Sequence, residues 1–397
     1  MATTPSANPL AVERTWKQRF GVPQAISAFM LALFLAQCAF FISHMPITQI
    51  EANYVRRGVD TLKRDEAVPD RQRSPLVGLA SLAGTVPVGG IRRAFNPFWL
   101  DEHRWMVRAP FLLAGLLLGA SLWYVARRLF GNQGGYIALG IYCFSPGIVA
   151  RSSLAGPEIL GAWGAFGLIF TAIATAHTLY APREVVLWNW KRIVLLGISI
   201  ALAVGSQWTL ALVLVPAIAF MLWAVPERRG AASAIMFAAC CVALVLVEVC
   251  YLASPSALIS GIAHASTGGV SFTQLLRLRM ISLVALFYVD ASPATIVVLV
   301  VALVAFASWR RTRFFGNVAP LIVAAMLLLC GFLLQESSGA MFFFYALPFL
   351  ILFASGVFAD LLESKRPGIP AGIAYGAILA QAVYSVIGLM RMYSGNN

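Results

Sequence analysis

The chain has 397 residues, of which 60% are hydrophobic and only 11% are charged, and its mean hydropathy is +0.81. Soluble domains carry about 25% charged residues, so the composition excludes a soluble globular protein and predicts an all-α polytopic integral membrane protein. The formal net charge of +13 would suggest nucleic-acid binding in a soluble protein. Here basic loops that fix topology and contact anionic lipid headgroups explain it, and we expect no nucleic-acid partner.

The predicted elements begin after a polar, basic stretch, residues 1–23, which we expect to form a tail. About 11 apolar segments follow, and most approach the roughly 20 residues that a bilayer requires. The candidate transmembrane helices are residues 24–44, 107–126, 133–150, 154–177, 193–206, 208–225, 231–253, 293–309, 317–334, 339–361 and 370–390. We predict a single transmembrane domain over residues 24–392, followed by a C-terminal tail, residues 393–397.

The loops between these segments predict the topology. Lys and Arg residues concentrate in the N-terminal tail and in the short loops on its side, which predicts a cytoplasmic N-terminus. Two long loops, residues 45–106 and 254–292, then lie outside. The first is too apolar for a free linker, so we expect interfacial helices on the outer face. The fifth and sixth segments meet at Ser206–Gln207, where we predict a tight or partly broken hairpin.

Two carboxylates lie near the outer ends of predicted spans. Glu51 is the first acid after the first span, and Glu158 lies in the short turn between the third and fourth spans. Both are expected at the same membrane depth, so we predict that their carboxylates line one cavity. A base that deprotonates an acceptor needs a carboxylate at the reacting centre. On spacing alone, a solvated loop acid is the competing interpretation of Glu51, and a helix cap that of Glu158.

Charged residues near these acids suggest a phosphate ligand. Arg57, Arg108 and Arg151 lie at the same predicted depth, and a phosphate leaving group requires nearby cations. Glu248 lies inside the seventh segment, where a carboxylate must be paired, protonated or directed into a polar cavity. Together the outer acids and arginines predict an outward-facing polar cavity.

The cysteines and histidines give no sign of a metal centre. All six cysteines fall in apolar runs, so neither a disulfide framework nor a paired metal spacing is present in the sequence. The cofactor is not identified by these patterns: a divalent cation at the outer acids is one option, and nothing in the sequence requires it. The sequence contains no P-loop, HExxH or GxSxG motif.

Several motifs resemble a known family. Ile50 to Tyr54, IEANY, stands where the family has a DE-x-x-Y motif at the start of a long outer loop, and residues 73–76, RSPL, are similar to its HPPL segment. The longest similarity runs from Arg108 to Gly161, through ARRLFG at residues 126–131 and Pro157-Glu158. The layout resembles the GT-C superfamily of polyprenyl-phosphate-dependent glycosyltransferases, of the protein O-mannosyltransferase and aminoarabinose-transferase type.

The sequence departs from the family pattern at three places. Ile50 replaces the first acid of the DE pair, and residues 207–209, QWT, stand where the family has a Lys. Late in the chain, Gly339 and Phe343 replace a Lys and an Arg, whereas Tyr345 is kept. These departures favour a second hypothesis, a non-catalytic GT-C-like accessory or structural subunit of a membrane complex. A transporter of a lipid-linked substrate is the third.

The resemblance implies a GT-C-like membrane bundle with an outer active-site cavity, in a bacterial-type inner membrane. It implies inverting transfer of a sugar from a polyprenyl-phosphate donor to an acceptor on the outer face. We expect Glu51 to act as base or acceptor-orienting group and Glu158 to assist it or hold a cation. The residues expected to bind substrate are Tyr54, Arg57, Arg108, Arg151, Glu248 and Tyr345. The expected partners are the lipid-linked sugar, membrane lipids and other proteins of a membrane complex.

Overall fold

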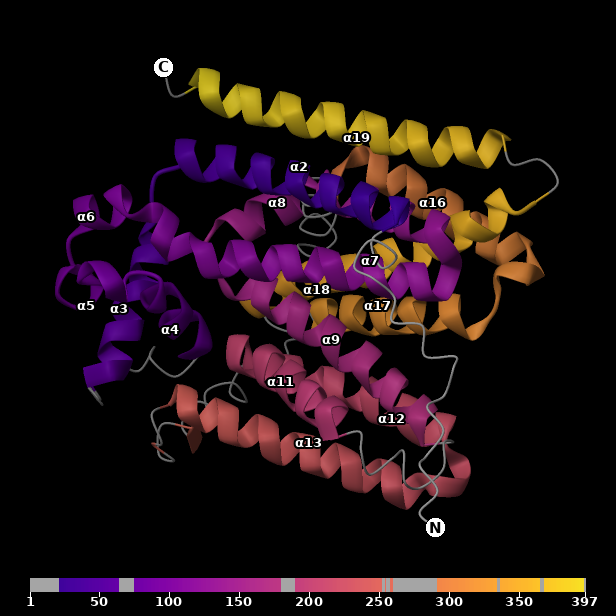
Figure 1. Cartoon of the computed structure of the whole chain (residues 1–397), viewed down its shortest axis with the longest axis horizontal. Helices are drawn as coiled ribbons and strands as arrows, with labels where there is room; N and C mark the ends of the chain where they lie inside the picture. The colour runs from indigo at the N-terminus through magenta and orange to yellow at the C-terminus, as the bar shows by residue number, and fades with distance from the viewer. Residues whose placement is uncertain are drawn as a thin grey trace, which may run out of the picture.

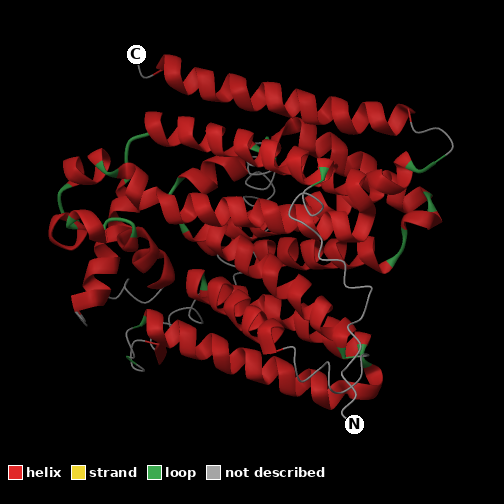
Figure 2. Ribbon diagram, viewed as in Figure 1, coloured by secondary structure: helices red, strands yellow, loops and turns green. Residues whose placement is uncertain are grey.

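The computed structural model describes residues 21–63, 75–179, 190–251, 254, 258–259, 291–333, 336–364 and 368–395. Most of the predicted N-terminal tail and of the predicted loop 254–292 lies outside these residues, as do residues 64–74 of the first loop. Within the described residues the chain is helical and has no strand (Figure 2), which confirms the predicted all-α class.

The first half of the described chain forms a long helix, a group of short helices and a long hairpin. Its elements are α2 (Val22–His44), α3 (Gln49–Lys63), α4 (Pro75–Ala83), η2 (Val86–Val88), α5 (Gly90–Arg93), α6 (Pro97–Glu102), α7 (Arg104–Cys143), α8 (Pro146–Ser153) and α9 (Pro157–Thr178). The short helices α3 to α6 gather at one end of the bundle, where the C-terminal end of α19 also lies (Figure 1).

The second half adds the remaining long helices of the bundle. Its elements are α11 (Trp190–Ser206), η3 (Trp208–Val213), α12 (Leu214–Ala224), η4 (Pro226–Arg228), α13 (Arg229–Cys250), α16 (Ser292–Ser308), η5 (Arg310–Thr312), α17 (Phe315–Leu333), α18 (Glu336–Leu362) and α19 (Gly368–Gly395). α19 extends through residues 393–395, where the sequence suggested a tail.

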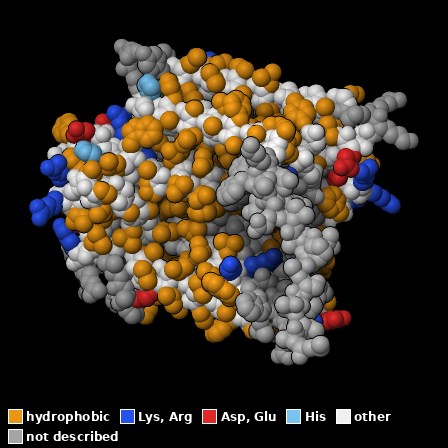
Figure 3. Space-filling model, viewed as in Figure 1, with side chains coloured by type: hydrophobic (Ala, Val, Ile, Leu, Met, Phe, Trp, Pro, Cys, Tyr) orange, Lys and Arg blue, Asp and Glu red, His pale blue; other side chains and the backbone are white. Residues whose placement is uncertain are grey.

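Each predicted span falls on helical structure. In the described part of the chain, seven helices are long and apolar enough to cross a membrane, and two shorter apolar helices cover residues 208–224 and 292–308. Hydrophobic side chains cover the middle of one face, whereas charged side chains gather mainly toward two opposite ends (Figure 3). This distribution fits a multi-pass membrane protein, and the count of about 11 spans stays a prediction.

α7 contains two predicted spans joined by a tight reversal. Gly131 has φ +73° and ψ −171°, a conformation that a residue without a Cβ adopts readily, and it separates the two arms. The Tyr142 hydroxyl donates a hydrogen bond of 2.6 Å to the carbonyl oxygen of Gly115 on the opposite arm. The second arm ends at Cys143, and the rest of the predicted third span is the separate helix α8, which starts at Pro146.

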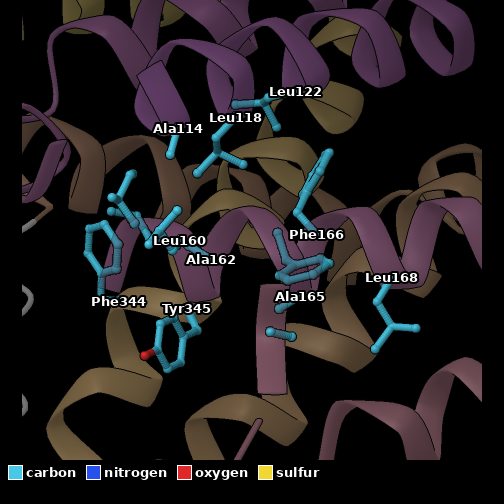
Figure 4. Packing of buried hydrophobic residues seen from close by; sticks show 14 of the residues in the cluster. Ala114, Leu118, Leu122, Leu160, Ala162, Ala165, Phe166, Leu168, Phe344 and Tyr345 are labelled. Carbon is cyan, nitrogen blue, oxygen red and sulfur yellow. The ribbon is translucent and has the colours of Figure 1, made fainter. Parts of the chain in front are cut away.

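α18 forms the centre of the bundle and packs against α17, α7, α16 and α9 (Figure 1). Its aromatic side chains interlock with those of α9: the Phe166 and Phe349 rings lie 5.6 Å apart between centroids. Apolar side chains from α7, α9 and α18 fill this region, and the Tyr345 ring lies beside them with its hydroxyl directed away (Figure 4). The apolar core thus ends where Tyr345 presents a polar atom.

α19 is attached to the bundle by buried hydrogen bonds. Gln381 accepts a bond of 2.8 Å from the Thr295 hydroxyl and donates one of 2.9 Å to the carbonyl of Ile141. The Ser385 hydroxyl donates to the Gln37 side chain at 2.8 Å. Because lipid tails are as apolar as leucine, polar contacts of this kind help to hold a peripheral membrane helix in place.

We expect Gly164→Ala to destabilise the crossing of α9 and α11. A Cβ on Gly164 would lie 2.3 Å from the backbone nitrogen of Ala203, and overpacking of this kind costs about 1–3 kcal/mol. Thermal unfolding in lipid nanodiscs measures the effect. Gly372→Ala on α19 is the matched control, because a Cβ there meets nothing within 4 Å. Equal melting temperatures for the two variants would contradict the predicted crossing.

Candidate functional site

Glu51 and Arg108 form a buried ion pair at the end of the bundle that carries α3 to α6. The Glu51 side chain accepts a hydrogen bond from Nε of Arg108 and another from its Nη2, each 2.8 Å long. Glu51 is 2% exposed and Arg108 is fully buried. Bidentate arginine–carboxylate pairs are among the strongest hydrogen-bonded contacts in proteins.

Backbone groups saturate both members of the pair. The Glu51 carboxylate also accepts bonds from the backbone nitrogen of Thr48 at 2.9 Å, from its hydroxyl at 3.1 Å and from the backbone nitrogen of Ala155 at 3.0 Å. Arg108 donates to the carbonyls of Met45 and Pro46, each at 2.8 Å. These donors fill the roughly four lone-pair directions of a carboxylate. The pair therefore ties together the α2–α3 connection, α7 and the turn between α8 and α9.

This arrangement differs from the roles expected for the two residues. We expected Glu51 to be a base and Arg108 to bind phosphate, but in this structure each group is occupied by the other and shielded from solvent. Burial acts to raise the pKa of the Glu51 carboxyl, yet the hydrogen bonding and charge of Arg108, together with the backbone hydrogen bonds from Thr48 and Ala155, outweigh it, and the pKa lies below its usual 4.5. Glu51 is therefore held ionised as a partner of Arg108.

The depressed pKa predicts a pH dependence of stability. A carboxyl whose pKa is lower in the folded state contributes stability above its unfolded-state pKa and loses it as pH falls through the folded pKa. We expect the melting temperature of the protein to fall as pH decreases below about 4.5, and Glu51→Gln to reduce this dependence. The control is Glu363→Gln, which removes the carboxylate of an exposed ion pair with Arg311. If the melting temperature depended on pH in the same way in the wild type and in Glu51→Gln, Glu51 would not be the ionised partner of Arg108.

A second ion pair lies more open at the same end. Nη1 of Arg151, at the end of α8, contacts Oε1 of Glu158, in the first turn of α9, at 2.5 Å. The Arg151 side chain is 36% exposed and that of Glu158 is 13% exposed. Gly156 allows the carboxylate to fold back over the turn, since a Cβ there would lie 2.3 Å from Oε2 of Glu158. This pair is accessible, unlike that of Glu51 and Arg108.

Tyr345 and Gln207 extend this group of polar side chains. The Tyr345 hydroxyl donates a hydrogen bond of 2.6 Å to Oε1 of Gln207, and its phenol lies within electrostatic range of Glu158, Arg151 and Tyr54. Gln207 has extended backbone geometry and separates α11 from η3, as the predicted partly broken hairpin requires. The structure thus brings together four of the predicted residues (Tyr54, Arg151, Glu158 and Tyr345), and adds Gln207.

The remaining predicted residues lie around this group. The Arg57 guanidinium lies over the Tyr54 ring, 5.4 Å from its centroid, on α3. Both carboxylate oxygens of Glu248 are shielded from solvent, and neither has a hydrogen-bond partner in the described part of the chain. Glu248 is within electrostatic range of Tyr251. The acids predicted at the outer face are therefore found in three settings: Glu51 in a buried ion pair, Glu158 in a partly exposed ion pair, and Glu248 without a hydrogen-bond partner in the described part of the chain.

Sequence analysis missed three members of this end of the bundle. Gln207 was noted as part of the predicted hairpin and of the segment that replaces a Lys, but not as a site residue. Trp208 donates a hydrogen bond of 2.9 Å to the Tyr251 hydroxyl. A signal for Thr48 was present, because Thr48-Gln49-Ile50-Glu51 has the spacing of a capping box. The structure shows both of its bonds, since the Glu51 nitrogen donates to the Thr48 hydroxyl at 3.2 Å. This capping box at the start of α3 therefore helps to orient the Glu51 side chain.

The described residues contain no group of three or more His, Cys, Asp or Glu side chains placed to hold a metal ion. Arg151–Glu158 combines a cation for an anionic ligand with a carboxylate that can accept a proton or a cation. Such a combination can bind a phosphate and deprotonate a neighbouring hydroxyl.

Residues 98–252 match the family model described as dolichyl-phosphate-mannose-protein mannosyltransferase. The matched segment includes Arg108, Arg151, Glu158 and Glu248. No curated protein matches this sequence significantly.

Solved structures share the fold over most of the chain. The archaeal oligosaccharyltransferase AglB from Archaeoglobus fulgidus, in complex with an inhibitory peptide and a dolichol-phosphate, has a TM-score of 0.60 and 12% identity, over 94% of this chain and 56% of that one. ArnT from Cupriavidus metallidurans, bound to undecaprenyl phosphate, has a TM-score of 0.53 and 12% identity, over 94% of this chain and 71% of that one. The chain thus spans little more than half the length of AglB. This chain shares its fold with both proteins.

Proposed function

We propose that this chain, which has the GT-C fold, is a membrane glycosyltransferase that transfers a sugar from a polyprenyl-phosphate donor to an acceptor at the α3–α6 end of the bundle. The observation that carries the proposal is the Arg151–Glu158 pair, partly exposed at the α8–α9 turn. It supplies one group for the donor phosphate and one for the acceptor hydroxyl. The AglB and ArnT structures, which hold dolichol-phosphate and undecaprenyl phosphate, support a lipid-phosphate ligand for the fold.

The chemistry follows from the two partners of this pair. When a donor phosphate binds Arg151, its charge replaces that of Glu158, and the carboxylate becomes available as a base. The acceptor hydroxyl oxygen then attacks the anomeric carbon, and its proton moves to Glu158. The bond from the anomeric carbon to the phosphate oxygen breaks, and its electron pair stays on polyprenyl phosphate. Arg151 stabilises the negative charge that develops there.

Neighbouring residues position these groups. Tyr345 packs against Gly161, where a Cβ would lie 3.0 Å from the ring, and its bond to Gln207 fixes the phenol beside Glu158. Arg57 on α3 provides a second cation for the donor phosphate, and Tyr54 orients it. Glu248, within electrostatic range of Tyr251, is a further substrate-binding residue in this proposal.

Glu51 and Arg108 act in this proposal as positioning residues. Glu51 accepts the backbone hydrogen bond of Ala155, three residues before Glu158, so the pair fixes the turn that carries the reacting carboxylate. Arg108 in turn holds the carbonyls of Met45 and Pro46 before α3. Catalytic positions tolerate errors of only about 0.5 Å, and a saturated ion pair provides this precision.

The proposal includes the cellular setting and the ligands. The chain is placed in a bacterial-type inner membrane with its N-terminus in the cytoplasm and the α3–α6 end outside. Its ligands are a polyprenyl-phosphate-linked sugar and membrane lipids. Proteins of a membrane complex are further proposed partners, and a divalent cation at Glu158 is an optional addition to this chemistry.

A donor panel tests the proposal. The full chain in lipid nanodiscs is incubated with undecaprenyl- and dolichyl-phosphate sugars, and mass spectrometry follows the release of free polyprenyl phosphate in the presence of peptide, glycan or lipid acceptors. We expect one donor class to be consumed only when an acceptor is present. Failure of all donors to bind, in nanodiscs where the protein is folded, would contradict the proposal.

One observation favours a second candidate, a non-catalytic subunit with the GT-C fold. Glu51 occupies the second position of the acidic motif of the family it resembles, yet it is saturated by Arg108, Thr48 and Ala155. An accessory subunit would retain this pair as a structural contact. Donor binding without turnover, combined with co-purification of a second membrane protein that restores turnover, would favour this candidate.

A further inference from the structure

Residues 91–98 present an exposed surface that combines apolar and basic side chains. Ile91 is 40% exposed, Phe95 is 50% exposed and Phe98 is 87% exposed. Arg92 and Arg93 between them are also exposed. Single exposed apolar side chains are common, but three within eight residues beside two arginines indicate an interaction surface.

The backbone holds the exposed side chains of residues 91–98 in place. Ala94 is fully buried and anchors the segment. The Asn96 side chain caps α6 by accepting hydrogen bonds from the backbone nitrogens of Phe98 at 3.1 Å and Trp99 at 3.3 Å. Trp99 turns inward, 6% exposed, and stacks on His103 with 4.3 Å between the ring centroids. Phe98 is therefore held outward by the same cap that turns Trp99 inward.

The exposed surface continues onto a membrane-spanning helix. α7 begins at Arg104, and its outward residues Trp105, Met106 and Leu113 are 42%, 37% and 56% exposed. α7 is long and apolar enough to cross a bilayer, and its first arm covers the predicted span 107–126, so we place these side chains at or just outside the start of that span. Only the rest of α6 and His103 separate residues 91–98 from the start of α7, which places this segment at the depth of the headgroups, where aromatic side chains concentrate.

The charged side chains around residues 91–98 indicate which class of lipid headgroup this surface binds. Two further cations flank the Phe95 ring, with Arg56 at 6.0 Å and Lys63 at 5.4 Å from its centroid. The nearby Asp101 side chain is occupied by the backbone nitrogen of Ile47 at 2.8 Å, whereas Glu102 is exposed. The local excess of positive charge is complementary to an anionic headgroup layer.

We propose that the 91–98 surface inserts Ile91, Phe95 and Phe98 into the bilayer interface and binds anionic phospholipid headgroups through Arg92 and Arg93. It is an interfacial anchor, selective for anionic lipid, that fixes the depth of the α3–α6 group. The inference does not depend on the glycosyltransferase proposal, because it concerns a surface separate from Arg151 and Glu158.

Hydrogen–deuterium exchange of peptides covering residues 86–98 tests this directly. The full chain is reconstituted in nanodiscs of pure phosphatidylcholine and in nanodiscs containing phosphatidylglycerol. We expect exchange to be slower in the anionic discs, by about fivefold for each arginine engaged. Arg92→Gln/Arg93→Gln should abolish the difference between the lipids, whereas Phe98→Ser should raise exchange in both. Added salt should weaken the lipid effect.

Arg310→Gln/Arg311→Gln is the matched control, because it removes two adjacent arginines of η5 and should leave exchange at residues 86–98 unchanged. Equal exchange of the wild type in the two lipids would overturn the proposal. A lipid difference that persists in Arg92→Gln/Arg93→Gln would also overturn it. Loss of folding in that variant would show as increased exchange throughout the bundle, and the single variants Arg92→Gln and Arg93→Gln would then provide the test.

Discussion

Arg108→Met is expected to destabilise the protein by about 3–5 kcal/mol, the cost of leaving a buried charge without its partner. Arg108 is fully buried, and its removal leaves the Glu51 carboxylate with backbone and hydroxyl donors only. The Met45 and Pro46 carbonyls lose their donor as well. Reversible unfolding in mixed micelles or nanodiscs measures the loss.

The matched comparison is Arg151→Gln, which breaks the partly exposed pair with Glu158. Pairs that are open to solvent contribute about 0–1 kcal/mol, so this variant should melt close to the wild type. The two arginines also separate the two interpretations of Arg108. If Arg108 were a phosphate ligand and not a positioning residue, Arg108→Met would fold normally and lose donor binding. Similar stability for both variants would therefore contradict the positioning role.

Glu158→Gln is expected to reduce the rate of sugar transfer by about 10²- to 10⁴-fold, the range of general-base assistance. The amide keeps the size of the side chain and cannot accept the acceptor's proton. Donor binding should persist, because Arg151 remains in place. Transfer is measured as release of polyprenyl phosphate with the donor that the panel identifies. The control is Glu227→Gln in η4, an exposed acid away from this site.

The dependence of rate on pH distinguishes a base from a structural contact. A proton acceptor gives a rate that rises with pH until the carboxyl is ionised, and Glu158→Gln should lose this limb. A merely structural role would lower the rate equally at all pH values. Glu158→Gln with near-wild-type transfer would exclude Glu158 as the base and return attention to Glu51.

The helical segments were largely predictable because hydropathy alone marks them. Long apolar runs must be helical in a bilayer, and each predicted span lies on helical structure. Breaks were harder to place. The third span was predicted over residues 133–150, but the helix there ends at Cys143 because Ser145-Pro146 starts a new helix. In an apolar sequence, such a break hardly changes the hydropathy.

The sequence predicted that these charged residues lie near one another at one end of the bundle, but it did not predict their pairings. Membrane depth could be estimated for Glu51, Arg108, Arg151 and Glu158, because each follows or begins an apolar run. The direction in which each side chain points could not be estimated. The pairing of Glu51 with Arg108, 57 positions apart, depends on how the α2–α3 connection packs on α7. Gln207 carries no charge and was therefore invisible to an argument based on acids and arginines.

The central claim is that a lipid phosphate binds at Arg151 while Glu51 and Arg108 remain paired. A structure of the full chain in nanodiscs with added undecaprenyl phosphate tests it most directly. We predict density for the phosphate within hydrogen-bonding distance of the Arg151 guanidinium, with Glu158 released from Arg151 and the Glu51–Arg108 contacts unchanged. A phosphate bound instead to Arg108, with Glu51 displaced and exposed, would contradict the account.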